Sequence, residues 1–154
     1  MRRARVIVGA VLLAGVTFGY RYLSFEGFSN DHFVHLARAQ QMLGGALPVR
    51  DYADSGLPNA ALTAAASAMA QILFGAGLHS ELLLVCGAFA VAAAVSYVLA
   101  LRVSGSTLLA VVGASVPVLA YPVSYSYPKV LSYVVALAAG WSYAVTPSTA
   151  RLIV

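Results

Sequence analysis

The sequence predicts an all-α fold: a polytopic membrane helical bundle of about four transmembrane helices, with an amphipathic helix on the membrane surface. Composition gives the first reason. Of the 154 residues, 61% are hydrophobic and 9% are charged, and the mean hydropathy is +0.86. A soluble domain carries about 25% charged residues, so this chain cannot cover a globule that faces water. The second reason is that long apolar runs alternate with short polar segments, which predicts a single membrane domain over residues 1–154.

The basic excess of the chain is read as a topology signal. The net charge is +4 and the isoelectric point is near 9.5. The basic residues stand singly along apolar segments, so no basic face with interleaved aromatics forms and nucleic acid is not an expected partner. Cys86 is the only cysteine. It excludes a disulfide framework and a cysteine-based metal site, and we expect a small buried side chain.

The first apolar segment, residues 6–23, is predicted to be an uncleaved membrane anchor. Three arginines precede it and place its start in the cytoplasm by the positive-inside rule. A signal peptide is the alternative, but residues 19–23 are bulky where a cleavage site has small residues. Tyr20 and Tyr22 suit an interfacial aromatic belt, and we expect Arg21 to extend to the lipid headgroups.

The next segment, residues 24–81, is predicted to be an extracytoplasmic loop. Four of the five acidic residues and two of the three histidines lie in its first part, residues 24–59: Glu26, Asp31, His32, His35, Asp51 and Asp54. Residues 58–75 within this loop are predicted to form the amphipathic helix. Its polar stripe recurs every four residues and comprises Asn59, Thr63, Ser67 and Gln71.

Residues 60–78 are also apolar enough for a membrane span, and this alternative stays open. If the helix does not cross, both Arg102 and Arg151 fall in the cytoplasm, as the positive-inside rule favours. If it crosses, Arg102 falls outside. We therefore prefer the arrangement in which it lies on the surface.

Three further spans are predicted: residues 82–101, 107–121 and 129–145. The first of these is long enough, at about 30 Å of helix, for the hydrocarbon core. Trp141 and Tyr143 lie near the inner end of the last span. The chain closes with what resembles the start of another apolar run, so we expect it to be the N-terminal part of a longer protein.

Asp31 is the leading candidate for a catalytic residue. It follows the first span directly, at the expected depth of the outer membrane surface. A carboxylate there accepts a proton from an alcohol or helps to hold a divalent cation. The alternatives are a solvated aspartate or the N-cap of a helix over residues 32–43.

Other charged residues supply candidate ligands. Asp51 and Asp54 either join Asp31 around a divalent metal ion or pair with Arg50 and Arg38; Asp54 is also suited to capping the helix that follows. His32 and His35 have a spacing compatible with one metal. Lys129, at the outer edge of the last span, either binds an anionic phosphate or extends to the headgroups.

The order of these features resembles the N-terminal part of the GT-C superfamily of membrane glycosyltransferases, in the branch of protein O-mannosyltransferases and aminoarabinose transferases. The likeness covers roughly residues 1–150, essentially the whole chain. It rests on the anchor span, Asn30-Asp31 opening a helix, residues 43–52 (LGGALPVRDY), and a proline-led helix ending Leu73-Phe74-Gly75. Two details depart from the family: His32 stands where many members have a second acid, and Leu57-Pro58-Asn59 replaces two prolines and a tyrosine.

The resemblance implies transfer of a sugar from a polyprenyl-phosphate donor to an acceptor hydroxyl on the extracytoplasmic face of the bacterial cytoplasmic (inner) membrane. Asp31 is then the general base or the neighbour of a metal, Lys129 and Arg50 bind substrate, and the expected partners are the lipid-linked sugar and the bilayer. A non-enzymatic membrane protein, such as part of a transporter or an assembly subunit, is the rival hypothesis. A second rival hypothesis is that the chain is an inactive fragment of a transferase.

Overall fold

The computed structural model describes residues 2–47, 50–51, 59–120 and 127–145, with the side chains of 2–3, 59–60 and 143–145 left out. These residues form α-helices and no β-strand, as the sequence predicts. The helices are α1 (Arg2–Leu23), α2 (Asn30–Leu43), α3 (Asn59–Phe74), α4 (Leu78–Ser104), α5 (Thr107–Ala120) and α6 (Tyr127–Val145). Each predicted helix is present, and the observed ends differ from the expected ones by a few residues.

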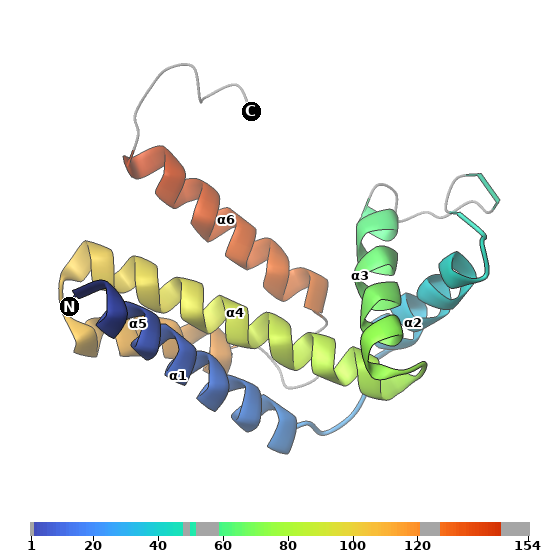
Figure 1. The fold of residues 1–154 in the computed structure, drawn as a ribbon, viewed down its shortest axis with the longest axis horizontal. Coiled ribbons are helices and arrows are strands. Elements are labelled where there is room, and N and C mark those ends of the chain that lie inside the picture. The colour runs from blue at the N-terminus through green and yellow to red at the C-terminus, as the bar shows by residue number, and fades with distance from the viewer. Residues whose placement is uncertain (1, 48–49, 52–58, 121–126, 146–154) are drawn as a thin grey trace.

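Helix α4 occupies the centre of the fold and contacts every other helix (Figure 1). Its buried face is made largely of small residues, so the neighbouring helices approach it closely. One cluster joins Val85, Ala88, Phe89 and Ala92 of α4 to Tyr127, Val130 and Val134 of α6. A second cluster joins Tyr97 of α4 to Ala110 and Ala114 of α5, with residues of α1 packed on it.

The long helices alternate in direction along the bundle. Arg102, at the end of α4, lies with its guanidinium carbon 5.6 Å from the ring centroid of Trp141, near the end of α6. Arg5, near the start of α1, lines the same groove as Arg102. The two arginines therefore share one end of the bundle, and the loop with α2 and α3 lies at the other end (Figure 1).

Helix α3 crosses the start of α4 at a steep angle instead of running along the bundle (Figure 1). It ends at Phe74, and the link to α4 uses Gly75 and Gly77 at φ angles of 94° and 135°. Most residues avoid such angles and glycine accepts them. The two glycines therefore permit the sharp change of direction between α3 and α4.

The polar stripe of α3 faces the protein and its large apolar side chains face outward. Ser67 and Gln71 are buried at 0% and 4% exposure. By contrast Leu62, Met69, Ile72, Leu73 and Phe74 are all more than half exposed. This is the reverse of a helix on a soluble protein, whose apolar stripe faces the core.

Two helical segments among the described residues are long and apolar enough to cross a membrane: Ala4–Leu23 and Leu78–Ser104. The apolar helices at Ala61–Phe74 and Thr107–Ala120 are shorter. Length and composition thus identify two candidate spans. Cys86 lies inside the second one and is buried, as expected.

Arg21 does not extend to the headgroups, contrary to the expectation from the sequence. It is 2% exposed, its guanidinium carbon lies 3.7 Å from the ring centroid of Phe89, and it donates a hydrogen bond to the carbonyl oxygen of Val118. The carbonyl of residue 118 would pair with the amide of residue 122 in a continuing helix, but residue 122 is a proline, which has no N–H. The arginine is therefore held inside the protein by a backbone acceptor and an aromatic face.

The contact between α1 and α4 can be tested at Gly9. A Cβ there would lie 2.5 Å from the hydroxyl oxygen of the buried Tyr97, whereas a Cβ at Gly15 would meet nothing within 4 Å. We expect Gly9→Val to lower the free energy of unfolding by about 1–3 kcal/mol because it overpacks this contact. Gly15→Val, the same change in the same helix, should have a smaller effect. The measurement is unfolding of the purified chain in detergent, and equal effects of the two substitutions would contradict the close approach.

Candidate polar site at the α2–α3–α6 junction

Polar side chains gather where α2 and α3 meet the first turns of α4 and α6. We call this set the polar junction. It comprises Asp31, His32 and His35 of α2, Ser67 and Gln71 of α3, Glu81 of α4, and Tyr127 and Lys129 of α6. In a chain with so few charged residues, this concentration is the most distinctive chemical feature of the described structure.

Asp31 and Lys129 form an ion pair across the junction. The Lys129 Nζ lies 3.1 Å from the Asp31 Oδ2, and the two side chains are 53% and 48% exposed. An ion pair so exposed contributes only about 0–1 kcal/mol to stability. The pair therefore matters for its chemistry: an accessible carboxylate and an accessible ammonium group stand side by side. Both residues were candidates from the sequence, and the structure brings them together.

The start of α6 is fixed by Tyr127, which is 1% exposed. Its hydroxyl donates a hydrogen bond of 2.5 Å to the carbonyl oxygen of Thr63 in α3. Its ring centroid lies 5.2 Å from that of His35 in α2. Lys129 follows two residues later, so these contacts of Tyr127 help to hold Lys129 beside Asp31. Tyr127 is thus a buried packing residue.

His32 caps the N-terminus of α2 and is completely buried. The N-cap is Ser29, not Asp31, so the capping role considered for Asp31 is wrong. The backbone N–H of Ser29 donates to the His32 Nδ1 at 3.0 Å, and the Ser29 Oγ lies 2.9 Å from the same nitrogen. The rings of Phe25 and Phe28 lie edge-on to the imidazole. Burial lowers the pKa of His32, and the nearby Asp31 only partly opposes this effect.

His35 is half-buried beside the ion pair. Burial is the largest cause that lowers its pKa, and Asp31 raises it in part, while Arg38 and Lys129 lower it further. The two histidines therefore favour the neutral form. They lie on the same helix, but the described residues contain no group of three His, Cys, Asp or Glu side chains placed to hold a metal ion.

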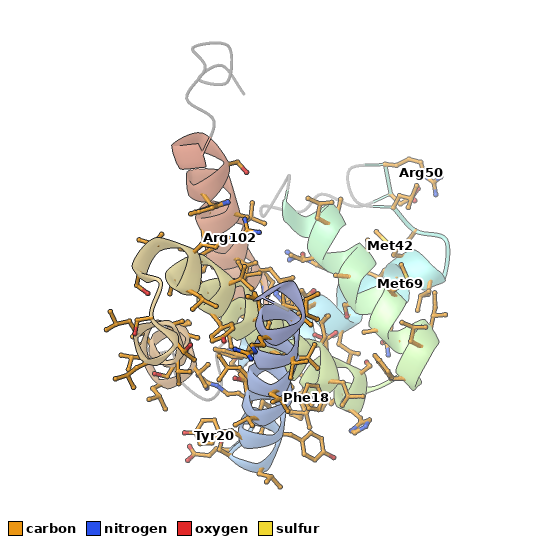
Figure 2. All side chains as sticks on the ribbon, turned by 60° about the vertical axis from the view of Figure 1, so that its left-hand side comes forward. Phe18, Tyr20, Met42, Arg50, Met69 and Arg102 are labelled. Atoms are coloured by element: carbon orange, nitrogen blue, oxygen red, sulfur yellow. The ribbon has the colours of Figure 1, made fainter. Side chains whose placement is uncertain are left out.

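Arg50 and Asp51 pair with each other, which was one of the two alternatives for Asp51. The Arg50 Nη2 lies 2.6 Å from the Asp51 Oδ2 and also donates to the carbonyl oxygen of Gly45 at 2.8 Å. The amide of Leu47 donates to the same carboxylate. The Arg50 guanidinium and this amide lower the pKa of Asp51. Figure 2 shows Arg50 at the edge of the molecule, on the loop after α2.

The metal site expected from Asp31, Asp51 and Asp54 stays a prediction. Asp51 is engaged by Arg50 and Leu47 within its own loop, and Asp54 lies outside the described residues. Capping by Asp54 lies outside them for the same reason. The described residues therefore do not form a metal site.

Glu81 is the functional candidate that sequence reasoning missed. It is 0% exposed, and the Ser67 hydroxyl donates a hydrogen bond to its Oε1. Within the described part of the chain, its Oε2 has no hydrogen-bond partner. A buried carboxylate requires polar partners, and the polar stripe of α3 supplies one. Two features of the sequence together could have identified it: the polar stripe of α3, and an acidic residue directly before the apolar run of α4.

No protein-family model, curated protein or solved structure matches this chain.

A pH dependence follows from the buried His32. Its pKa is lower in the folded state than the value of about 6.5 in an unfolded chain. The stability that depends on the neutral imidazole is therefore complete above about pH 6.5 and is lost as the pH falls below that value and through the lower pKa of the folded state. His32→Gln keeps an acceptor for the N-cap amide but cannot titrate.

We expect the thermal midpoint to fall less in His32→Gln than in the wild type between about pH 7.5 and about pH 5. The matched control is His79→Gln, since His79 is an exposed histidine. Circular dichroism at a series of pH values measures both. An unchanged pH profile in His32→Gln would show that His32 is not a source of the dependence.

The hydrogen bond between Ser67 and Glu81 can be tested by truncation. Ser67→Ala leaves a fully buried carboxylate without its donor, and we expect a loss of roughly 1–3 kcal/mol in the free energy of unfolding. Ser104→Ala removes an exposed hydroxyl at the far end of α4 and should cost less than about 0.5 kcal/mol. Unfolding in detergent distinguishes the two, and an equally small effect at Ser67 would contradict the contact.

Proposed function

We propose that this chain is an integral membrane protein that forms part of a GT-C-type glycosyltransferase. It moves a sugar from a polyprenyl-phosphate donor to an acceptor hydroxyl on the extracytoplasmic face. The observation that carries the proposal is the accessible pair of Asp31 and Lys129, 3.1 Å apart. A proton acceptor and a cation for phosphate are the two groups that this reaction needs side by side.

The outward apolar surface supports a lipid environment. Only 11% of the apolar segment of α1 is buried, although a core helix of a soluble protein is mostly buried. The large side chains of α3 also face outward, as described above. Contiguous apolar surface of this kind requires lipid or another protein against it.

The contacts of α1 favour an anchor over a cleaved signal peptide. Gly9 packs on Tyr97, and Arg21 reaches Phe89 and Val118. These contacts tie α1 to α4 and α5 along much of its length. A segment that is removed after export has no need of them.

The directions of the helices support four crossings with α3 on the surface. Arg5 and Arg102 line one groove, so the start of α1 and the end of α4 share one side. This is what the arrangement with a non-crossing α3 requires. Asp31 and Lys129 then lie together on the opposite, extracytoplasmic side, and the basic residues at the groove lie in the cytoplasm.

In the proposed reaction the acceptor hydroxyl loses its proton to the Asp31 carboxylate as its oxygen bonds to the anomeric carbon of the sugar. The bond from that carbon to the phosphate oxygen breaks, and the polyprenyl phosphate leaves. Lys129 binds the phosphate and balances its charge. The outer face of α3 is apolar and, in this proposal, offers a surface for the polyprenyl chain.

The proposal is tested first by binding. The purified chain in nanodiscs is titrated with a short-chain polyprenyl phosphate and, separately, with the corresponding polyprenol. We expect the phosphate to bind more tightly, and Lys129→Met to weaken it by about tenfold or more, since a charge-assisted hydrogen bond is lost. Glu26→Gln removes an exposed acid of the same loop and should leave binding unchanged.

Transfer is measured in membranes that contain the chain, with a radiolabelled sugar donor. Asp31→Asn should abolish transfer while binding of the polyprenyl phosphate persists, because the base acts on the acceptor. If the phosphate and the alcohol bind with equal affinity and Lys129→Met has no effect, the transferase proposal is contradicted and a non-enzymatic membrane protein is favoured. Binding without transfer in the wild type would favour the inactive fragment.

A further inference from the structure

A second polar feature lies at the end of the bundle away from the polar junction. An open groove of about 1000 Å³ runs between the first turns of α1, the last turns of α4 and the start of α5. Arg5 and Arg102 line it, and Thr107 adds a hydroxyl. Glu81 starts α4 and Arg102 ends it, so the groove lies about 30 Å along this helix from the polar junction.

The groove is positively charged. It is lined by the two arginines and by no acidic residue. Two helices, α1 and α5, begin at this end, and α4 and α6 end here, so the helix dipoles offset one another and the positive charge comes from the arginines. The acidic residues of the chain lie elsewhere, in residues 26–54 and at the start of α4. An anion is therefore the favoured occupant.

Arg102 is held in position at the edge of the groove. Its guanidinium lies against the ring of Trp141, and Figure 2 shows it beside α6. A guanidinium placed in this way is partly ordered before a ligand arrives, and its planar donors match a phosphate. Gly105 follows at a φ of 66° and ends α4, which leaves the arginine in the last turn.

The remaining walls of the groove are apolar. They are formed by Val6, Ile7, Ala10 and Val11 of α1 and by Val98 and Leu101 of α4. Ile7 and Val11 are 63% and 64% exposed. A ligand that fits must therefore combine an anionic group at the arginines with an apolar chain along these helices.

We propose that this groove binds an anionic phospholipid of the surrounding leaflet, with its phosphate between Arg5 and Arg102 and an acyl chain along α1 and α4. Basic pockets between helices on the cytoplasmic side are suited to such headgroups. The inference rests on the membrane location in the proposed function and is independent of transferase activity, which belongs to the opposite end of the bundle.

The only tryptophan of the chain, Trp141, makes the proposal directly testable. The purified chain is placed in nanodiscs that contain either brominated phosphatidylglycerol or brominated phosphatidylcholine at the same mole fraction. Bromine quenches tryptophan fluorescence at contact distance. We expect stronger quenching by the anionic lipid, and Arg5→Gln should lower the preference by about fivefold.

The control is Arg38→Gln, which removes the same charge from α2 at the other end of the molecule and should leave the preference intact. Arg102→Gln also changes the surroundings of Trp141 and so its fluorescence. The effect of this substitution is therefore measured as the ratio of quenching by the anionic lipid to quenching by the neutral lipid. Equal quenching by both lipids in the wild type overturns the proposal. Little quenching by either, with crosslinking of two chains through cysteines placed at Ile7, would also overturn it and assign the groove to a second copy.

Discussion

The packing of small residues on α4 is the constraint on which the other features of this structure depend. Alanines at positions 88, 92 and 93 and the glycine at position 9 of α1 let the helices approach closely. In the membrane location that we propose, there is little hydrophobic force between helices, so close packing and polar contacts hold them together. Through these contacts α4 sets the direction of α1, α5 and α6. Those directions in turn bring the start of α6 to α2 and the start of α1 to the end of α4.

Polar contacts then fix the end of this bundle that carries α2 and α3. There Arg21 joins α1 to α4 and α5 through the ring of Phe89 and the carbonyl of Val118. At the junction with α3, Ser67 and Tyr127 hold α3 to α4 and to α6. Buried polar groups that find partners rigidify a core. The exposed pair of Asp31 and Lys129 is thus supported by contacts that are themselves buried.

Helix positions could be predicted from the sequence because each depends on local patterns of apolar residues and on local stops. Gly105, for example, ends α4 in the left-handed conformation that glycine favours. The direction of the α3 stripe could not be predicted, since a pattern shows that two faces differ but not which neighbour each one meets. The alternation of Ser67 and Gln71 with apolar residues fits both outcomes. Only the packing against α2 and α4 decides between them.

The candidate site was predictable only in part, for a similar reason. Asp31 and Lys129 were each candidates, but 98 residues separate them, and no local signal joins positions so far apart. Asp51 was expected near Asp31, whereas the neighbouring Arg50 engages it within its own loop. Glu81 was overlooked because an acidic residue next to an apolar run usually indicates the end of a membrane span. Its burial becomes evident only when Ser67 is placed against it.

The inverted orientation of α3 links the fold to the proposed chemistry. With its polar face turned to Glu81, α3 leaves its large apolar side chains on the outside. A helix with this orientation is stable where its outer face meets lipid, because water there would leave that apolar surface unburied. Asp31 and Lys129 are exposed at the polar junction, which the other face of α3 meets through Thr63 and Ser67. In the function that we propose, the outer face of α3 faces lipid while its polar face borders the junction at which Lys129 meets the donor phosphate. The orientation that makes α3 unsuitable for water thus agrees with the membrane location that we propose for this chain.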